Sequence, residues 1–162
     1  MARQNVPKPP GHSALRKGRV SIPGQSYIVT TVTQDRRPIF TDFEVGCVVV
    51  AAMRQLHDRN AVESLAFVVM PDHLHWLFTL GETIDLAEVV RRLKGSSAHA
   101  IRRLGVSPVW QAGYYDHGIR DDEDLRVAAR YLVANPLRAG LVENLGDYPL
   151  WDAVWLDSSL EG

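Results

Sequence analysis

The chain has 162 residues, of which 46% are hydrophobic and 23% are charged, a balance typical of one folded domain with its own core. No apolar run is long enough to span a membrane, and the first residues lack the apolar segment of a signal peptide, so we expect a cytoplasmic protein. The formal net charge of −1 excludes the strongly basic balance of a non-specific nucleic-acid binder, so any anion-binding surface must be local.

Basic side chains are concentrated in two places. The first is a Pro- and Gly-rich arm over residues 1–24, and the second lies on an expected helix over residues 84–104. The residues of these two clusters that we single out are Arg16, Lys17 and Arg19 in the arm and Arg91, Arg92, Lys94, Arg102 and Arg103 on the helix. From the sequence alone, each cluster is either a solvated surface or a site for an anionic partner.

Residues 26–33 are rich in β-branched and aromatic side chains and predict the first strand. A helix is expected over residues 41–59, where Thr41 and Glu44 have the spacing of a capping box with Thr41 as the N-cap. Apolar residues then recur every three to four positions. The expected buried stripe of this helix is Phe43, Cys47, Val50, Met53 and Leu56.

Two further strands, over residues 64–70 and 74–80, are expected to form a hairpin across Pro71-Asp72-His73. The second helix covers residues 84–104 and has a weak point at Gly95-Ser96-Ser97, since glycine is a poor helix former.

An irregular strand over residues 109–117 precedes the third helix. Asp121 and Asp122 are expected to cap this helix, because acids in a first turn complement the helix dipole. Its expected buried stripe is Leu125, Ala128, Ala129 and Leu132. Residues 143–162 contain three large aromatic side chains among acids and turn formers, and we expect this tail to pack over the domain.

The order β-α-β-β-α-β followed by a helix predicts an α+β fold, a ferredoxin-like split βαβ sandwich with an antiparallel sheet. The expected organisation is an arm of residues 1–24, a central domain of residues 25–142 and a tail of residues 143–162. Because this fold supports many unrelated functions, the function has to be argued from particular side chains.

His73 and His75 form the first candidate site. Side chains alternate along a strand, so the two imidazoles share one face while Leu74 points to the other. Two adjacent imidazoles can form half of a metal site. From this pair alone, two metal ligands and two histidines on a polar strand face are equally good interpretations.

Tyr131 and Asn135 are four positions apart on the third helix, so they lie on one face, one turn apart. Pro136 biases Asn135 away from helical geometry, which would turn its amide outward as an oxygen ligand. The ordinary alternative is a tyrosine that packs its ring at the rim of the core and an asparagine that caps a helix end.

Several segments together resemble the REP-associated tyrosine transposases, a branch of the single-tyrosine HUH transposases. The resemblance covers about Ser26 to Val142. The segments that carry it are Val69-Met70-Pro71-Asp72-His73-Leu74-His75-Trp76-Leu77, Tyr131-Leu132-Val133-Ala134-Asn135-Pro136-Leu137-Arg138-Ala139-Gly140-Leu141-Val142, Pro38-Ile39-Phe40, Val109-Trp110-Gln111 and Tyr115-Asp116-His117.

The resemblance implies a catalytic domain over residues 25–142 with a trailing catalytic helix. His73 and His75 would bind Mg²⁺ or Mn²⁺, with Asn135 where related enzymes have glutamine. Tyr131 would attack a phosphodiester of single-stranded DNA, leaving a covalent 5′-phosphotyrosine and a free 3′-hydroxyl.

The implied partner is single-stranded DNA that carries a palindromic hairpin, with no membrane involved and with the protein acting as a monomer or a homodimer. Both basic clusters and Tyr115 are the candidate DNA contacts. Tyr114 and Tyr115 are rival nucleophiles, because Asp116 and His117 follow them directly. Two other functions stay open: a non-catalytic module that binds hairpin DNA on the same fold, and a small metallohydrolase that leaves Tyr131 idle.

Overall fold

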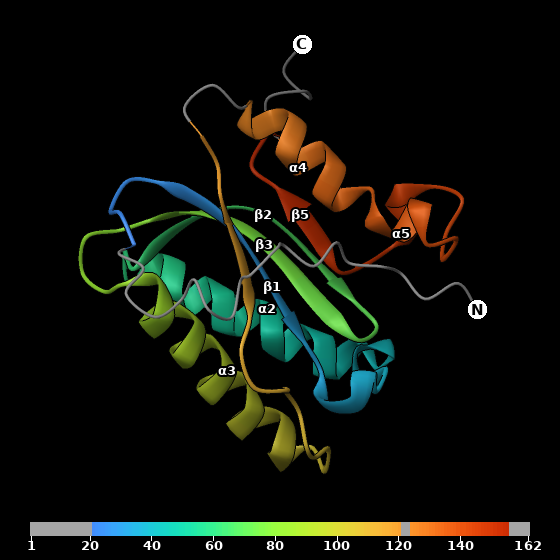
Figure 1. Cartoon of the computed structure of the whole chain (residues 1–162). Helices are drawn as coiled ribbons and strands as arrows, with labels where there is room; N and C mark the ends of the chain where they lie inside the picture. The colour runs from blue at the N-terminus through green and yellow to red at the C-terminus, as the bar shows by residue number, and fades with distance from the viewer. Residues whose placement is uncertain (1–20, 121–123, 156–162) are drawn as a thin grey trace.

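A computed structural model of the protein describes residues 21–120 and 124–155 (Figure 1). Five antiparallel strands form one sheet in the order β4-β1-β3-β2-β5. The strands are β1 (Ser26–Val32), β2 (Val62–Met70), β3 (His73–Leu80), β4 (Tyr115–Gly118) and β5 (Trp151–Ala153). The helices are α2 (Phe43–Asp58), α3 (Leu86–Arg103), α4 (Leu125–Val133) and α5 (Asn135–Arg138). The first four strands in this order have the ferredoxin-like arrangement, so the expected α+β fold is confirmed.

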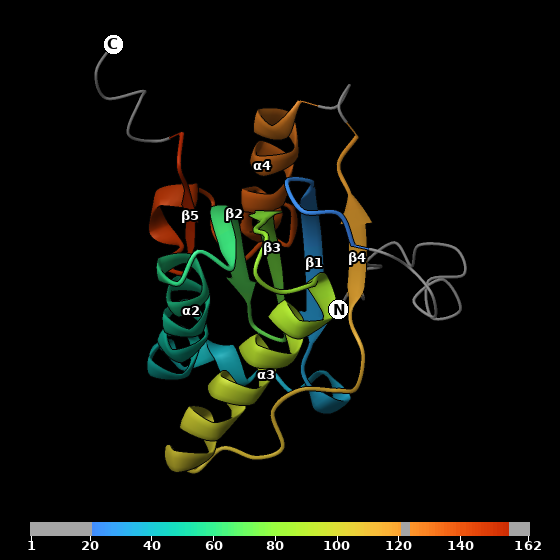
Figure 2. The same cartoon turned by 90° about the vertical axis from the view of Figure 1, so that its left-hand side faces the viewer.

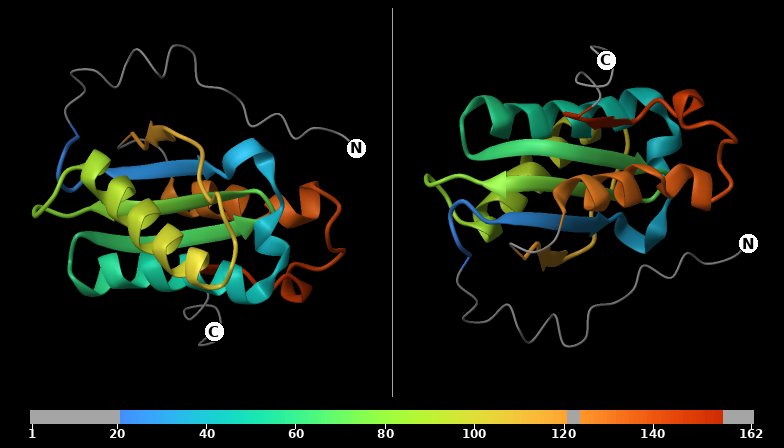
Figure 3. Two further views of the ribbon diagram at one scale, coloured as in Figure 1. Left: turned by 90° about the horizontal axis from the view of Figure 1, so that it is seen from below. Right: turned by 90° about the horizontal axis from the view of Figure 1, so that it is seen from above.

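Two helical layers enclose the sheet. Helices α2 and α3 cover one face and α4 covers the other (Figures 2 and 3). Side chains of β3 alternate between the two faces of the sheet. Leu74 and Trp76 pack in the core under α2 and α3, whereas Leu77 packs in the core under α4. No helix in the described ranges has the length and hydropathy that a membrane span requires.

Helix α2 begins one residue later than the sequence predicts. Asp42, not Thr41, is the N-cap, and its side chain accepts a hydrogen bond from the amide of Glu44. The predicted buried stripe is also wrong in part, since Phe43 is 56% exposed. The buried side is Val45, Gly46, Val49, Ala52, Met53 and Leu56. The segment is apolar almost all round, so its periodicity alone does not determine which side faces the sheet.

Helix α3 runs without a break through its predicted weak point. The hydroxyl of Ser97 donates to the carbonyl of Leu93 at 2.6 Å and accepts a hydrogen bond from the indole Nε1 of Trp110 at 3.0 Å. Ser97 therefore joins the helix to the loop before β4. That loop is strand-like only at an isolated bridge between Thr33 and Trp110, so the predicted strand over residues 109–117 is reduced to the short β4.

Asp124 is the N-cap of α4, where its side chain accepts a hydrogen bond from the amide of Arg126. The predicted caps, Asp121 and Asp122, lie outside the described residues, as do Arg16, Lys17 and Arg19 of the arm. Of the predicted stripe, Ala129 and Leu132 are buried.

The C-terminal segment adds the strand β5, which the sequence analysis did not predict. Its residues pair with Ala66, Phe67 and Val68 of β2. Just before it, the hydroxyl of Tyr148 donates to the carbonyl of Val69 at 2.5 Å, and the amide of Val69 donates to the carbonyl of Leu150 at 2.8 Å. The described part of this segment therefore contributes a strand to the sheet.

Candidate active site

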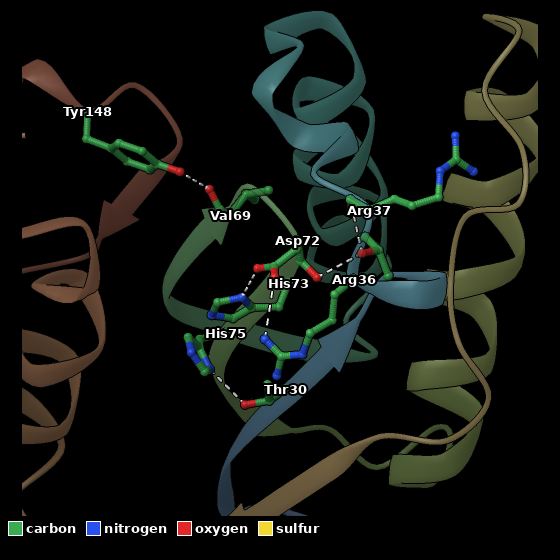
Figure 4. Close-up of polar contacts among 9 residues, drawn as sticks. Thr30, Arg36, Arg37, Val69, Asp72, His73, His75 and Tyr148 are labelled. Carbon is green, nitrogen blue, oxygen red and sulfur yellow. Dashed lines mark hydrogen bonds and ion pairs between the residues drawn. The ribbon is translucent and has the colours of Figure 1, made fainter. Parts of the chain in front are cut away.

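His73 and His75 lie side by side on β3, on the sheet face that α4 covers. In the neighbouring strand β1, His73 is paired with Val32 and His75 with Thr30. Figure 4 shows the two imidazoles close together. Their ring centroids are 4.7 Å apart and the ring planes are at 80° to each other. The alternation that the sequence predicts thus places both imidazoles on one face.

Asp72 determines the orientation of the His73 ring. The Nδ1 atom of His73 lies 2.6 Å from a carboxylate oxygen of Asp72, whose other oxygen lies 3.4 Å from Arg36 (Figure 4). The hydrogen bond with His73 lowers the pKa of Asp72, and the positive charge of Arg36 acts in the same direction, so this carboxylate stays ionised and accepts the hydrogen bond from Nδ1. A neutral His73 then has its lone pair on Nε2.

The Nε2 atom of His73 is buried and has no hydrogen-bond partner in the part of the chain that the structure describes. The side chain as a whole is 2% exposed. Buried ring nitrogens are normally satisfied, and a carboxylate behind the opposite nitrogen is the usual second support of a metal-binding histidine. The His73 and Asp72 pair therefore fits a metal ligand.

His75 is held in the neutral form. Burial lowers its pKa to about 3; a protonated His73 and the charge of Arg138 act in the same direction, while Asp72 opposes them. Its Nδ1 atom is 2.7 Å from the hydroxyl of Thr30. A neutral imidazole anchored through one nitrogen can offer the other one to a cation.

The turn between β2 and β3 is fixed from both sides. The amide of Thr33 donates to the carbonyl of Asp72 at 2.9 Å, and the amide of Phe40 donates to the carbonyl of Pro71 at 3.0 Å. Phe40 is buried against Trp110, with ring centroids 5.4 Å apart. The segments around Phe40 and Trp110 that carry the family resemblance therefore support this turn, and Trp110 is a packing residue.

Tyr131 lies on α4 and is 67% exposed, so its ring does not pack at the rim of the core as the ordinary alternative expects. The guanidinium carbon of Arg138 lies 3.9 Å from the centroid of the ring. The buried side of the same helix, with Ala129 and Leu132, packs on the sheet face of the two histidines. Tyr131 is thus a solvent-accessible phenol on the helix that covers this face.

Asn135 begins α5 directly after the end of α4. Its Nδ2 atom donates to the carbonyl of Leu132 at 2.7 Å, so the amide caps the end of α4 as the ordinary interpretation expects. This bond uses the amino side of the amide and leaves Oδ1 as an acceptor. The described residues contain no group of three or more His, Cys, Asp or Glu that could hold a metal, and Asn135 as a third ligand stays a prediction.

Tyr115 lies on the same sheet face as the histidines. It is paired with Thr30, and Thr30 is paired with His75, so the three side chains form one row across β4, β1 and β3. Neighbouring strands are about 4.8 Å apart, so Tyr115 is about 10 Å from His75. Tyr114 instead packs against the core under α2 and α3. Tyr115 is therefore the more serious rival nucleophile.

The basic cluster of α3 lies on the other face of the sheet from the histidines (Figure 2). Arg91 and Arg92 are bonded to Glu88 at 2.5 and 2.9 Å, and the ammonium of Lys94 donates to the carbonyl of Gln111 at 2.9 Å. The last turn of α3 carries two exposed basic side chains, Arg102 and Arg103. The structure does not bring this cluster together with the candidate metal ligands.

Sequence reasoning missed two polar residues of the site, Asp72 and Arg138. The signal for Asp72 was an acid directly before His73, a position from which a carboxylate can reach the Nδ1 of the ring. The signal for Arg138 was a basic residue shortly after Pro136, where the chain turns back toward α4.

Residues 21–135 match the model of the family described as "Transposase IS200 like", and the chain belongs to this family. It is 30% identical over 132 residues to the REP-associated tyrosine transposase of Escherichia coli (strain K12), across 81% of this chain and 78% of that protein. It is also 30% identical over 141 residues to a putative REP-associated tyrosine transposase of Haemophilus influenzae, across 78% of each chain. The resemblance drawn from the sequence motifs is confirmed.

The fold is similar to that of a solved REP-associated tyrosine transposase bound to a REP hairpin. The TM-score is 0.71 at 26% identity, across 88% of this chain and 83% of that one. A putative transposase from Deinococcus radiodurans, with a TM-score of 0.52 at 24% identity, shares the fold across 73% of this chain and 95% of its own. The family match and the 30% identical relatives identify the chain as a transposase of the single-tyrosine type.

Proposed function

We propose that this transposase nicks and rejoins single-stranded DNA beside a hairpin through a covalent bond between Tyr131 and a 5′-phosphate. The observation that carries the proposal is the buried Nε2 of His73, oriented by Asp72 and without a hydrogen-bond partner among the described residues. Beside it lies a neutral His75, on the face covered by the helix of Tyr131.

His73 and His75 would hold Mg²⁺ or Mn²⁺, with the amide oxygen of Asn135 as the third protein ligand. A bound divalent cation neutralises a non-bridging phosphate oxygen and aligns the phosphodiester for in-line displacement. The carboxylate of Asp72 supports the ligand set through the Nδ1 of His73. Three protein ligands leave coordination positions for phosphate and water.

Tyr131 would form the covalent bond. Its phenolic oxygen attacks phosphorus, the bond from phosphorus to the 3′-oxygen breaks, and the 3′-oxygen leaves as a hydroxyl after taking up a proton. The phenol loses its own proton to solvent. In the reverse reaction the 3′-hydroxyl attacks and the phenolate leaves, so joining needs no external energy source. The exposed position of Tyr131 lets a polymeric substrate reach the hydroxyl.

The proposed substrate is single-stranded DNA with a palindromic hairpin, because a similar protein of known structure is bound to a REP hairpin. Candidate backbone contacts are Arg16, Lys17 and Arg19 of the arm and the two exposed arginines that end α3, while Tyr115 is a candidate for stacking on an unpaired base. We propose that the protein acts in the cytoplasm, as a monomer or a homodimer.

The test is to incubate the protein with hairpin-containing single-stranded DNA and Mn²⁺ and to look for a protein–DNA adduct on a denaturing gel. We expect His73→Ala to abolish the adduct and to leave hairpin binding largely intact, since phosphate contacts elsewhere supply most of the affinity. His99→Ala, an exposed histidine on α3, is the matched control and should behave as wild type.

Full cleavage by His73→Ala in EDTA would contradict the metal-dependent mechanism. A wild-type protein that binds the hairpin with Mn²⁺ present and never forms an adduct would favour the non-catalytic hairpin-binding module.

A further inference from the structure

Arg138, the last residue of α5, contacts Tyr131 in two ways. Its Nη2 atom donates to the backbone carbonyl of Tyr131 at 2.6 Å, and its guanidinium carbon lies 3.9 Å from the centroid of the phenol ring. The two residues are seven positions apart, so this is not a contact between adjacent turns of one regular helix. The chain turns between α4 and α5, where Asn135 and the buried Pro136 follow the end of α4.

The pair is held by its own contacts more than by the core. Tyr131 is 67% exposed, and Arg138 is exposed as well. An exposed tyrosine on a helix can change between staggered rotamers. A planar guanidinium that stacks on the ring and is anchored to the backbone of the same residue restricts that freedom.

Arg138 also lies on the same short helix as Asn135, the candidate third ligand, three positions further along the chain. The guanidinium therefore connects the phenol of Tyr131 to the helix that carries a candidate metal ligand, and there the orientation of the phenol matters for attack on a bound phosphodiester.

We propose that Arg138 is a positioning residue that holds the Tyr131 ring in the orientation from which its hydroxyl reaches the phosphodiester. This inference rests on the proposed function, and it adds a residue that acts through the nucleophile. Misplacement of a reacting group by about 1 Å can cost about 100-fold in rate, so removing the stack should slow the covalent step.

The contact itself is testable without DNA or metal. Protein labelled with 3-fluorotyrosine gives ¹⁹F NMR lines, and Tyr131→Phe identifies the line of Tyr131. We expect Arg138→Ala to shift this line toward that of a free, exposed tyrosine. Arg126 is an exposed arginine near the start of α4, the helix of Tyr131. The control variant Arg126→Ala should leave the Tyr131 line unshifted. An unchanged Tyr131 line in Arg138→Ala would overturn the proposal.

The consequence for the reaction is tested by single-turnover adduct formation at saturating hairpin DNA. We expect Arg138→Ala to lower the rate of adduct formation by about 10- to 100-fold while the Kd for DNA changes far less. Arg138→Lys keeps the charge and a hydrogen-bond donor but not the planar stack, so it should restore only a small part of the rate. Arg126→Ala should leave both quantities unchanged.

A weaker Kd with an unchanged rate at saturation would overturn the proposal, because Arg138 would then be a DNA contact only. Full restoration of the rate by Arg138→Lys would also overturn it, since charge alone would then suffice. A wild-type protein that forms no adduct would contradict the proposed function, and the NMR comparison would still decide whether Arg138 holds the ring.

Discussion

The carboxylate of Asp72 determines which nitrogen of His73 faces the candidate metal site. It accepts from Nδ1 at 2.6 Å, and this leaves Nε2 buried beside His75. Arg36 lies 3.4 Å from the other carboxylate oxygen and reaches it from a backbone in the left-handed region, with φ of 52°. Such a conformation is uncommon for arginine, which fits a residue held in place by its surroundings.

Asp72→Asn should lower the affinity for Mn²⁺ by about 10- to 100-fold, because an amide is a poorer acceptor for the Nδ1 proton and lets the ring adopt the other tautomer. Isothermal titration with Mn²⁺ measures this without any DNA. Asp58→Asn, at the exposed end of α2, is the control and should bind Mn²⁺ as wild type does. Equal affinities for wild type and Asp72→Asn would contradict the role of the carboxylate.

For single residues, the sequence was sufficient to predict a position that follows from strand alternation or helical spacing. His73 and His75 share a face because a strand alternates, and Asn135 lies at a helix boundary because proline follows it. The stack of Arg138 on Tyr131 could not be predicted, because it depends on the angle at which the chain turns between α4 and α5.

Among the elements, α3 has two kinds of arginine. Arg91 and Arg92 are bonded to Glu88, whose pKa these hydrogen bonds lower to about 2, so all three groups stay charged and partly neutralise one another. Arg102 and Arg103 are exposed in the last turn. Only the second pair offers its full charge to a phosphate backbone.

If α3 binds DNA, replacing Arg102 and Arg103 with glutamine should reduce the salt slope of hairpin affinity by about 1 for each phosphate that the variant no longer neutralises. The same replacement of Arg91 and Arg92 should change the slope less. The measurement is hairpin affinity by fluorescence anisotropy over a series of salt concentrations. Identical slopes in wild type and both variants would place the phosphate footprint away from α3.

A helix or strand could be predicted from the sequence where its apolar residues fall on one face only. Helix α3 has a clear apolar stripe and was expected nearly to its ends. The buried side of α2 was predicted correctly only in its second half, at Met53 and Leu56, because Val45 to Val50 is apolar all round except at Gly46. Strand β5 was missed, since three residues give too short an alternation, and its pairing with β2 depends on distant parts of the chain.

In the whole molecule, the C-terminal segment is joined to the strand that leads into the histidine turn. The hydroxyl of Tyr148 donates to the carbonyl of Val69, two residues before Pro71 (Figure 4). Leu150 is buried against α2 at Gly46. A Cβ atom at Gly46 would overlap with Cδ1 of Leu150, so the glycine allows this close approach. The segment therefore stabilises the edge of the sheet near the site.

Tyr148→Phe should lower the free energy of unfolding at neutral pH by about 1 kcal/mol, because one part-buried hydrogen bond is removed. It should also change the response to alkali. Burial raises the pKa of Tyr148 from 10.0 to about 12, so between these values the unfolded chain loses the proton first and wild type loses stability as the pH rises. That part of the alkaline loss should be absent in Tyr148→Phe.

Urea unfolding at pH 8 and pH 11 makes this comparison. Tyr131→Phe is the control, since its exposed ring should leave the alkaline loss as in wild type. An equal alkaline loss in wild type and Tyr148→Phe would show that the part-buried hydroxyl of Tyr148 does not carry the effect.

The central claim, that Tyr131 is the nucleophile, is tested most directly by mapping the peptide that carries DNA after the reaction with hairpin DNA and Mn²⁺. Trypsin separates the candidates, because Tyr131 falls in the peptide of residues 131–138 and Tyr114 and Tyr115 fall together in residues 104–120. The account predicts DNA on residues 131–138, and no adduct with Tyr131→Phe, which should still fold and bind the hairpin. DNA on residues 104–120, or an adduct that persists in Tyr131→Phe, would contradict it.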